Sequence, residues 1–130
     1  MKRLKRIITL ILSALLLSSC SPESGIDIGY RQISMDDALR MMSSEIGYII
    51  LDVRTAEEYN EGHIPGAINV PNESIGNSEI PELPDKSQHI LVYCRSGRRS
   101  KEAAEKLVKL GYTNVSEFGG IIDWKGEIAK

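Results

Sequence analysis

Two kinds of segment alternate along the chain from residue 30 onward. Short apolar runs, such as residues 90–93, are typical of strands that a parallel sheet buries on both faces. Segments whose apolar residues recur every three to four positions are typical of helices that cover such a sheet. The pattern predicts strands at residues 31–33, 48–53, 67–70, 89–93 and 115–118. It predicts helices after Ser34, after Thr55, over 101–110 and over 121–128, so the expected fold class is α/β with a parallel sheet and right-handed crossovers.

Local signals support the helix boundaries. Ser34 is a good N-cap because two acidic residues follow in the first turn, and Thr55 forms a capping box with Glu58. Glycines at positions 47, 62 and 111 are placed to end the helices. Residues 71–87 contain three prolines, so we expect a loop there with at most one turn of helix.

The first twenty residues have the pattern of an export signal. Four basic residues precede an apolar run over 7–17 and the small residues before Cys20. The run is too short to span a bilayer as a helix. Residues 17–20 also resemble the bacterial lipobox, which implies cleavage before Cys20 and lipid on its thiol. We therefore expect a lipoprotein signal peptide at 1–19, a lipidated Cys20 with a flexible tether at 20–29, and one domain at 30–130, anchored in a membrane of the cell envelope on its extracytoplasmic side. An ordinary secretory signal or an uncleaved anchor are the alternatives.

Removal of the signal changes the charge and the cysteine count. Residues 1–19 hold four of the 16 basic residues and none of the 18 acidic ones, so residues 20–130 carry a net charge of about −6. An acidic body argues against nucleic acid as a partner. With Cys20 acylated, Cys94 has no disulfide partner and becomes a candidate reactive thiol. Motifs for a metal, a dinucleotide or a phosphate loop are missing from the sequence, so neither a metal nor a cofactor is expected, and we expect a monomer.

The chemistry is expected at Cys94, where a buried strand passes into the start of a helix. The residues between are small, flexible or cationic, so their amides can turn inward and form an anion-binding nest at the helix N-terminus. A thiol at the centre of such a nest ionises readily. The alternative, a small buried core cysteine, leaves the neighbouring arginines unexplained. The loop residues that would form the nest are Arg95, Ser96, Gly97, Arg98, Arg99 and Ser100.

Other polar residues are expected at the same edge of the sheet. Asp52 and Arg54 end the second strand, and ligands of parallel sheets bind beyond the carboxyl ends of the strands. We expect these two residues to brace the loop through an ion pair or hydrogen bonds. His63 follows a helix, and we expect it at the opposite, amino edge in a structural role.

Several motifs in order resemble a single-domain rhodanese over residues 31–128. They are Asp52-Val53-Arg54, Glu58-Tyr59, Gly62-His63-Ile64-Pro65-Gly66-Ala67, Tyr93-Cys94-Arg95-Ser96-Gly97-Arg98-Arg99-Ser100, and Gly119-Gly120 with Trp124. The resemblance implies a five-stranded parallel sheet in the order 1-5-4-2-3, flanked by helices on both faces. It also implies a sulfurtransferase that uses Cys94.

The implied reaction has two steps. The Cys94 thiolate attacks the outer sulfur of a small donor such as thiosulfate, expels sulfite and becomes a persulfide, and a thiol or cyanide then accepts the sulfur. Inward amides of residues 95–100 would stabilise each anion. Arg95 or Arg99 is favoured over Arg98 for contact with the donor's sulfonate.

Two other functions remain possible. A cysteine phosphatase or arsenate reductase uses the same strand, loop and helix, but its signature places arginine six positions after the cysteine, where this chain has Ser100. Tyr93 also replaces the histidine that usually precedes that cysteine. A non-enzymatic persulfide carrier could have the same loop, and the sequence does not separate it from an enzyme.

Overall fold

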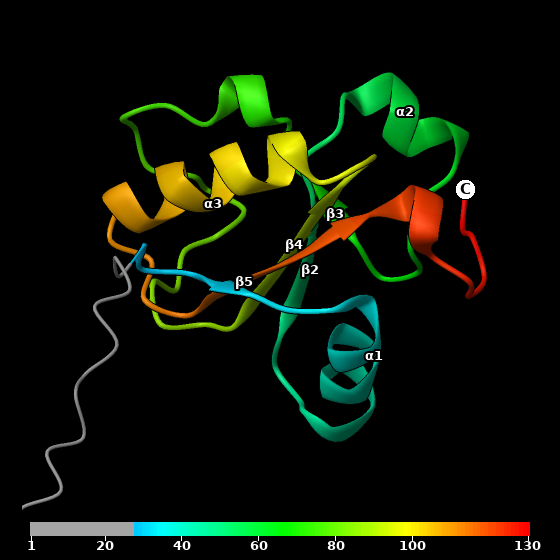
Figure 1. Cartoon of the computed structure of the whole chain (residues 1–130). Helices are drawn as coiled ribbons and strands as arrows, with labels where there is room; N and C mark the ends of the chain where they lie inside the picture. The colour runs from blue at the N-terminus through cyan, green and yellow to red at the C-terminus, as the bar shows by residue number, and fades with distance from the viewer. Residues whose placement is uncertain (1–27) are drawn as a thin grey trace, which may run out of the picture.

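A five-stranded parallel sheet forms the centre of the protein, which is described over residues 28–130 in a computed structural model (Figure 1). The strand order is β1-β5-β4-β2-β3, which confirms the order implied by the rhodanese resemblance. The predicted signal peptide, Cys20 and most of the tether lie outside the described residues. The strands are β1 (Arg31–Gln32), β2 (Ile49–Asp52), β3 (Ile68–Asn69), β4 (Ile90–Cys94) and β5 (Val115–Gly120).

Helices cover both faces of this sheet, as Figure 1 shows for α1 (Met35–Ser44) and α3 (Arg98–Lys109). Alternate residues of β4 belong to two separate hydrophobic clusters because side chains alternate across a strand. Val92 and Cys94 pack in the cluster that contains buried residues of α3. Leu91 and Tyr93 pack in the cluster that contains Ala38 of α1. Cys94 therefore lies on the α3 face of the sheet.

The predicted helix caps are present. The Ser34 side chain accepts a hydrogen bond from the backbone N–H of Asp37 at the start of α1. Thr55 and Glu58 form the complete capping box of α2 (Ala56–Glu61). The loop predicted at 71–87 contains one short 3-10 helix, η1 (Asn72–Ser74). No helix within residues 28–130 is long and apolar enough to cross a membrane.

The helix predicted over residues 121–128 is wrong. Only one 3-10 turn forms, η2 (Ile121–Asp123), and the chain is extended at Trp124. The backbone of Ala129 instead exchanges two hydrogen bonds with the backbone of His63. Gly126 lies against the Trp124 ring, where a Cβ would be 2.8 Å from the nearest ring atom. The final residues therefore satisfy their backbone groups by pairing with another segment rather than by continuing a helix.

Candidate active site at the carboxyl end of β4

The loop between β4 and α3 curves around the sulfur of Cys94. The backbone N–H of Gly97 donates to Sγ at a distance of 3.0 Å, and Ser100 Oγ lies 3.4 Å from Sγ. Gly97 has a φ of 109°, a left-handed conformation that favours glycine and turns its amide inward. This turn lets α3 begin at Arg98, three residues earlier than predicted, so the helix N-terminus lies directly beside the thiol.

Burial and hydrogen bonding act in opposite directions on this thiol. Cys94 is 1% exposed, and burial raises its pKa. The contact with the Ser100 side chain and the hydrogen bonds from the amides of Ser100, Gly97 and Ser96 lower it, and the net pKa is below the ordinary value of a cysteine. Cys94 is therefore both a core residue and an acidic thiol, so the two alternatives considered from the sequence do not exclude each other.

The three arginines of the loop have different partners. Arg99 forms a bidentate ion pair with Glu58 of α2, with distances of 2.7 and 3.0 Å. Arg98 pairs with Glu102 one helical turn further along α3 and is exposed. The exposed Arg95 has no ion pair among residues 28–130, and its backbone oxygen accepts from the N–H of Ile122 at 3.2 Å. Arg95 is thus the loop arginine whose charge is not already paired.

The ion pair between Glu58 and Arg99 has a strong electrostatic effect. The hydrogen bond from Arg99 lowers the pKa of Glu58 to about 2. The pKa of Arg99 is raised, first by Glu58 and also by the nearby Cys94. The sequence analysis placed Glu58 in a helix cap and in a motif shared with the rhodanese family, and neither indicated a contact with a residue 41 positions away.

Asp52 and Arg54 form a buried ion pair in which Arg54 Nη2 lies 2.8 Å from Asp52 Oδ2. Their further hydrogen bonds do not go to the loop that we expected them to brace. Arg54 donates to the backbone oxygen of Gly62 at 2.6 Å, and Asp52 accepts from the hydroxyl of Tyr93 at 2.7 Å. The pair therefore supports the strand residue immediately before Cys94 and only indirectly the loop.

His63 does not lie at the amino edge of the sheet, where we expected it. Its neighbours Gly62 and Ile64 hydrogen bond to Arg54 and Tyr93, which lie at the carboxyl ends of β2 and β4. The imidazole stacks on the ring of Tyr59, with centroids 3.8 Å apart. β3 has only two residues and pairs with Leu51 and Asp52 at the end of β2, so the α2–β3 connection stays near the carboxyl edge.

The end of β5 presses against the outside of the loop. A Cβ on Gly120 would lie 2.0 Å from the backbone oxygen of Arg95, so only glycine fits there. This close contact explains Gly120, whereas Gly119 has a φ of 96°, a left-handed conformation that favours glycine.

Known proteins resemble this chain both in sequence and in fold. The family profile described as rhodanese, rhodanese-like domain, matches residues 34–127. The chain belongs to the rhodanese-like family. The thiosulfate sulfurtransferase PspE of Escherichia coli is 41% identical over 73 residues, which are 56% of this chain and 70% of that protein. Thiosulfate sulfurtransferase 16 of Arabidopsis thaliana, a chloroplastic protein, is 40% identical over 89 residues, 60% of this chain and 74% of that protein.

Solved rhodanese structures share the fold. A structure of a rhodanese with anions from E. coli has a TM-score of 0.58 and 37% identity, and covers 64% of this chain and 98% of its own. The rhodanese-like domain of an Anabaena protein has a TM-score of 0.68 and 30% identity, and covers 75% and 77% of the two chains.

One polar residue of this rhodanese-like site was missed by the sequence analysis. Glu117 of β5 is 3% exposed, and its Oε1 accepts hydrogen bonds from Ser100 Oγ at 2.7 Å and from the N–H of Gly119 at 2.9 Å. A charged residue inside the predicted strand 115–118 was the one available signal. It gave no indication that the side chain reaches the residue beside Cys94.

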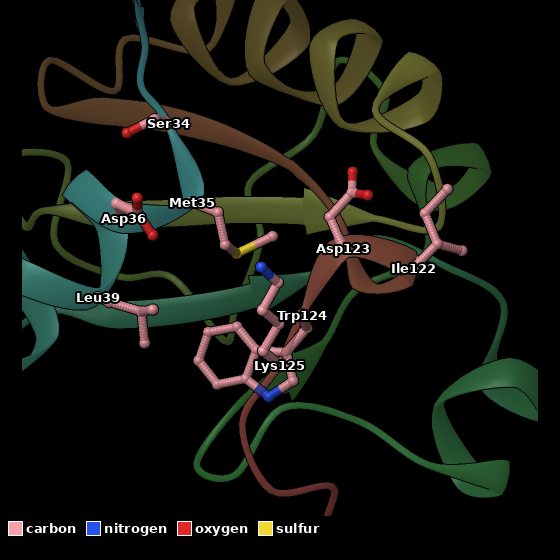
Figure 2. A pocket seen from close by; sticks show the side chains of 8 residues that line it. All are labelled: Ser34, Met35, Asp36, Leu39, Ile122, Asp123, Trp124 and Lys125. Atoms are coloured by element: carbon pink, nitrogen blue, oxygen red, sulfur yellow. The ribbon is translucent and has the colours of Figure 1, made fainter.

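A hollow with a volume of about 440 Å³ lies beside η2, between the start of α1 and the segment after β5 (Figure 2). Met35 and Leu39 of α1 contribute apolar surface on one side, and Trp124 contributes it on the other. Trp124, which lies in the segment predicted as a helix, donates its indole N–H to the backbone oxygen of Glu127. Charged residues, Asp36, Asp123 and Lys125, also line this hollow, and its residue Ile122 hydrogen bonds through its N–H to the backbone of Arg95 in the loop.

Proposed function

We propose that this rhodanese-like protein is a sulfurtransferase that moves sulfane sulfur from a small anionic donor such as thiosulfate to a thiol or cyanide. The observation that carries the proposal is the 3.0 Å hydrogen bond from the Gly97 amide to Cys94 Sγ, inside a loop that starts a helix. Backbone amides that point at a sulfur in this way stabilise its negative charge without a histidine base. The relatives named thiosulfate sulfurtransferases support the same chemistry.

In the first step the Cys94 thiolate attacks the outer sulfur of thiosulfate. A new bond forms between Sγ and that sulfur, while the sulfur–sulfur bond of thiosulfate breaks and its electron pair leaves with sulfite. The products are a persulfide anion on Cys94 and sulfite, and their total charge equals that of the thiolate and thiosulfate. Because Arg95 is not ion-paired within residues 28–130, it is the residue of the loop that we propose attracts the anionic donor.

In the second step an acceptor thiolate or cyanide attacks the outer sulfur of the persulfide. The bond to Cys94 breaks and its electron pair returns to Sγ, which the loop amides again stabilise. The energetic benefit of one such donor is about 3 kcal/mol of barrier in comparable sites.

The test compares the full-length protein with Cys94→Ser in three assays: thiocyanate formation from thiosulfate and cyanide, persulfide formation on a small thiol, and aryl phosphate hydrolysis. We expect the first two activities in the wild type and their loss in Cys94→Ser. Cys94-dependent phosphate release without sulfur transfer would replace this proposal with a phosphatase. A persulfide on Cys94 without turnover would make the protein a carrier, a role that appears in the name of the putative sulfur carrier protein YrkF of Bacillus subtilis.

We also propose that the protein is a lipoprotein of the cell envelope, with lipid on Cys20. The proposal is supported by the basic start, the apolar run over 7–17 and the small residues before Cys20. Mass spectrometry of the membrane fraction should identify an acylated N-terminal peptide that begins at Cys20. A secreted chain with another N-terminus, or an uncleaved one, would contradict it.

A further inference from the structure

Glu117 is a buried carboxylate that the proposed sulfur transfer does not use. It projects from β5 toward the N-terminus of α3, and no ion pair joins it to a lysine or arginine in residues 28–130. A buried charge without a cation requires strong hydrogen bonds. Those bonds come from the N–H of Gly119 and from the hydroxyl of Ser100.

The Ser100 hydroxyl has one hydrogen and more than one acceptor for it. Glu117 Oε1 lies at 2.7 Å, the backbone oxygen of Gly97 at 2.9 Å, and Cys94 Sγ at 3.4 Å. A hydroxyl–carboxylate distance of about 2.7 Å is typical of a charge-assisted bond, the stronger kind. The hydrogen therefore points to Glu117 while Glu117 is ionised.

This arrangement withholds a hydrogen bond from the thiolate. With its hydrogen on Glu117, Ser100 presents a lone pair to Sγ. In that orientation the lone pair can accept from the thiol S–H but gives S⁻ no hydrogen bond. If the hydroxyl turns to the sulfur, its oxygen faces the carboxylate oxygen at 2.7 Å without a hydrogen between them. Cys94 and Glu117 thus compete for one hydrogen atom.

We propose that ionised Glu117 is a positioning residue that holds the Ser100 hydrogen away from Cys94 and so keeps the thiolate basic and strongly nucleophilic. This role deepens the proposed function and rests on it. The amides of the loop lower the pKa of the thiol, and Glu117 limits how far the Ser100 hydroxyl adds to that effect. A less basic thiolate would be a weaker nucleophile toward the donor's sulfur.

Other charges surround these three side chains and are kept unchanged in the test. Lys101 of α3 and Asp123 of η2 line the same surface hollow as Glu117. On another side of Cys94, Arg99 of α3 is paired with Glu58 of α2.

The test is the substitution Glu117→Gln, which keeps the size of the side chain and removes its charge. The rate of Cys94 alkylation by iodoacetamide is measured against pH in the full-length protein. Mass spectrometry of the tryptic peptide 87–95, which contains Cys94 and not Cys20, separates the two cysteines. We expect Cys94 to become about tenfold more acidic, because Ser100 is free to donate to the thiolate and a nearby negative charge is gone. At a pH above the pKa of Cys94 in both proteins, alkylation should be about threefold slower in Glu117→Gln.

The same substitution in a Ser100→Ala background separates the hydrogen bond from simple charge repulsion. There we expect Glu117→Gln to change the acidity by less than about threefold, because only the charge effect remains. Equal shifts in both backgrounds would refute the role of Ser100, and no shift, or a less acidic Cys94, would refute the proposal altogether. Glu105→Gln removes an exposed carboxylate of α3 and should leave the titration unchanged. Thermal unfolding confirms that each variant is folded, and because alkylation needs no sulfur donor, the result is independent of whether the protein transfers sulfur.

Discussion

At the scale of single residues, Arg99 shows that a cation next to a reactive sulfur need not be free to bind substrate. Its guanidinium lies against the Glu58 carboxylate, and the two side chains are 17% and 28% exposed. The ion pair ties the first turn of α3 to α2, and it neutralises one of the two arginines that the sequence favoured for the donor. The positive charge offered to a sulfur donor therefore comes mainly from Arg95 and from the helix N-terminus.

The Glu58–Arg99 pair predicts an acid-sensitive contribution to stability. The pKa of Glu58 is about 2 in the folded protein, against an ordinary value of 4.5. Because this pKa is depressed, the stabilisation is present above about pH 4.5 and is lost as the pH falls toward 2. We expect Glu58→Gln to lower the free energy of unfolding by about 1–2 kcal/mol at pH 6, and by much less at pH 3, after allowance for solvent screening.

Urea unfolding at the two pH values measures this difference. Glu57→Gln changes the exposed neighbour in the same helix turn and is the matched control. An equal loss for Glu58→Gln at pH 6 and pH 3 would mean that the ion pair is not the source of the effect.

At the scale of elements, the end of β5 forms the outer wall of the Cys94 loop. Strand pairing between β4 and β5 shifts register after Val92, and this irregularity brings Gly120 opposite Cys94. The sequence marked the glycines but could not reveal the contact, because a register shift depends on how two strands far apart in the chain pair. For the same reason Glu117 and Ser100 were not connected beforehand.

Gly120→Ala is expected to displace the loop, since the new methyl group would overlap the backbone of Arg95. We expect a loss of sulfur transfer of at least about a hundredfold, comparable to the loss of an oxyanion donor. Steady-state kinetics with thiosulfate and cyanide provide the measurement. Gly76→Ala adds the same methyl group where nothing lies within 4 Å, and it should retain full activity. Normal activity in Gly120→Ala would show that the wall is not needed.

A second contact between elements joins β4 to the segment after α2. The hydroxyl of Tyr93 donates to Asp52 at 2.7 Å and accepts from the N–H of Ile64 at 3.1 Å, in a fully buried position. Tyr93→Phe leaves the buried N–H of Ile64 without its partner and leaves Asp52 Oδ2 with its Arg54 bonds alone, so we expect a loss of about 1–3 kcal/mol in the free energy of unfolding. In denaturant titrations, Tyr30→Phe, whose hydroxyl accepts one 3.5 Å contact from Gln32, should cost far less. Equal losses of unfolding free energy in Tyr93→Phe and Tyr30→Phe would show that the buried hydroxyl of Tyr93 stabilises the fold no more than an exposed one.

At the scale of the whole molecule, the alternation of apolar runs and helical segments was sufficient to predict the α/β class. The family resemblance supplied the strand order, and the position of Cys94 at a strand end followed from the residues themselves. Sequence reasoning failed where short connections decide the geometry. The segment at 121–128 has helix-compatible residues, yet pairing of Ala129 with His63 overrides that local preference. His63 was misplaced because an α2 of six residues does not carry the chain back to the amino edge.

The amino and carboxyl edges of the sheet hold different parts of the protein. Gly29 and Tyr30 lie beside Thr113 and Val115 at the amino edge, whereas Cys94 ends β4 at the opposite edge. In a Cys94→Ser background, we expect a bulky maleimide polymer to label Lys101→Cys several-fold faster than Thr113→Cys when the protein is bound to vesicles through the proposed lipid on Cys20. In detergent the two rates should converge. Faster labelling at position 113 on the membrane would contradict the proposed anchor.

If Cys20 carries the proposed lipid, the entry of the chain at the amino edge of β1 sets an orientation for the described domain. Seven residues lie between Cys20 and Ile28, and the eight steps from one to the other reach about 28 Å at full extension. A lipid on Cys20 would therefore hold the amino edge of the sheet toward the bilayer. The Cys94 loop, at the opposite edge, would then face the aqueous compartment. Sulfur acceptors would then have to arrive from that compartment and not by diffusion within the lipid.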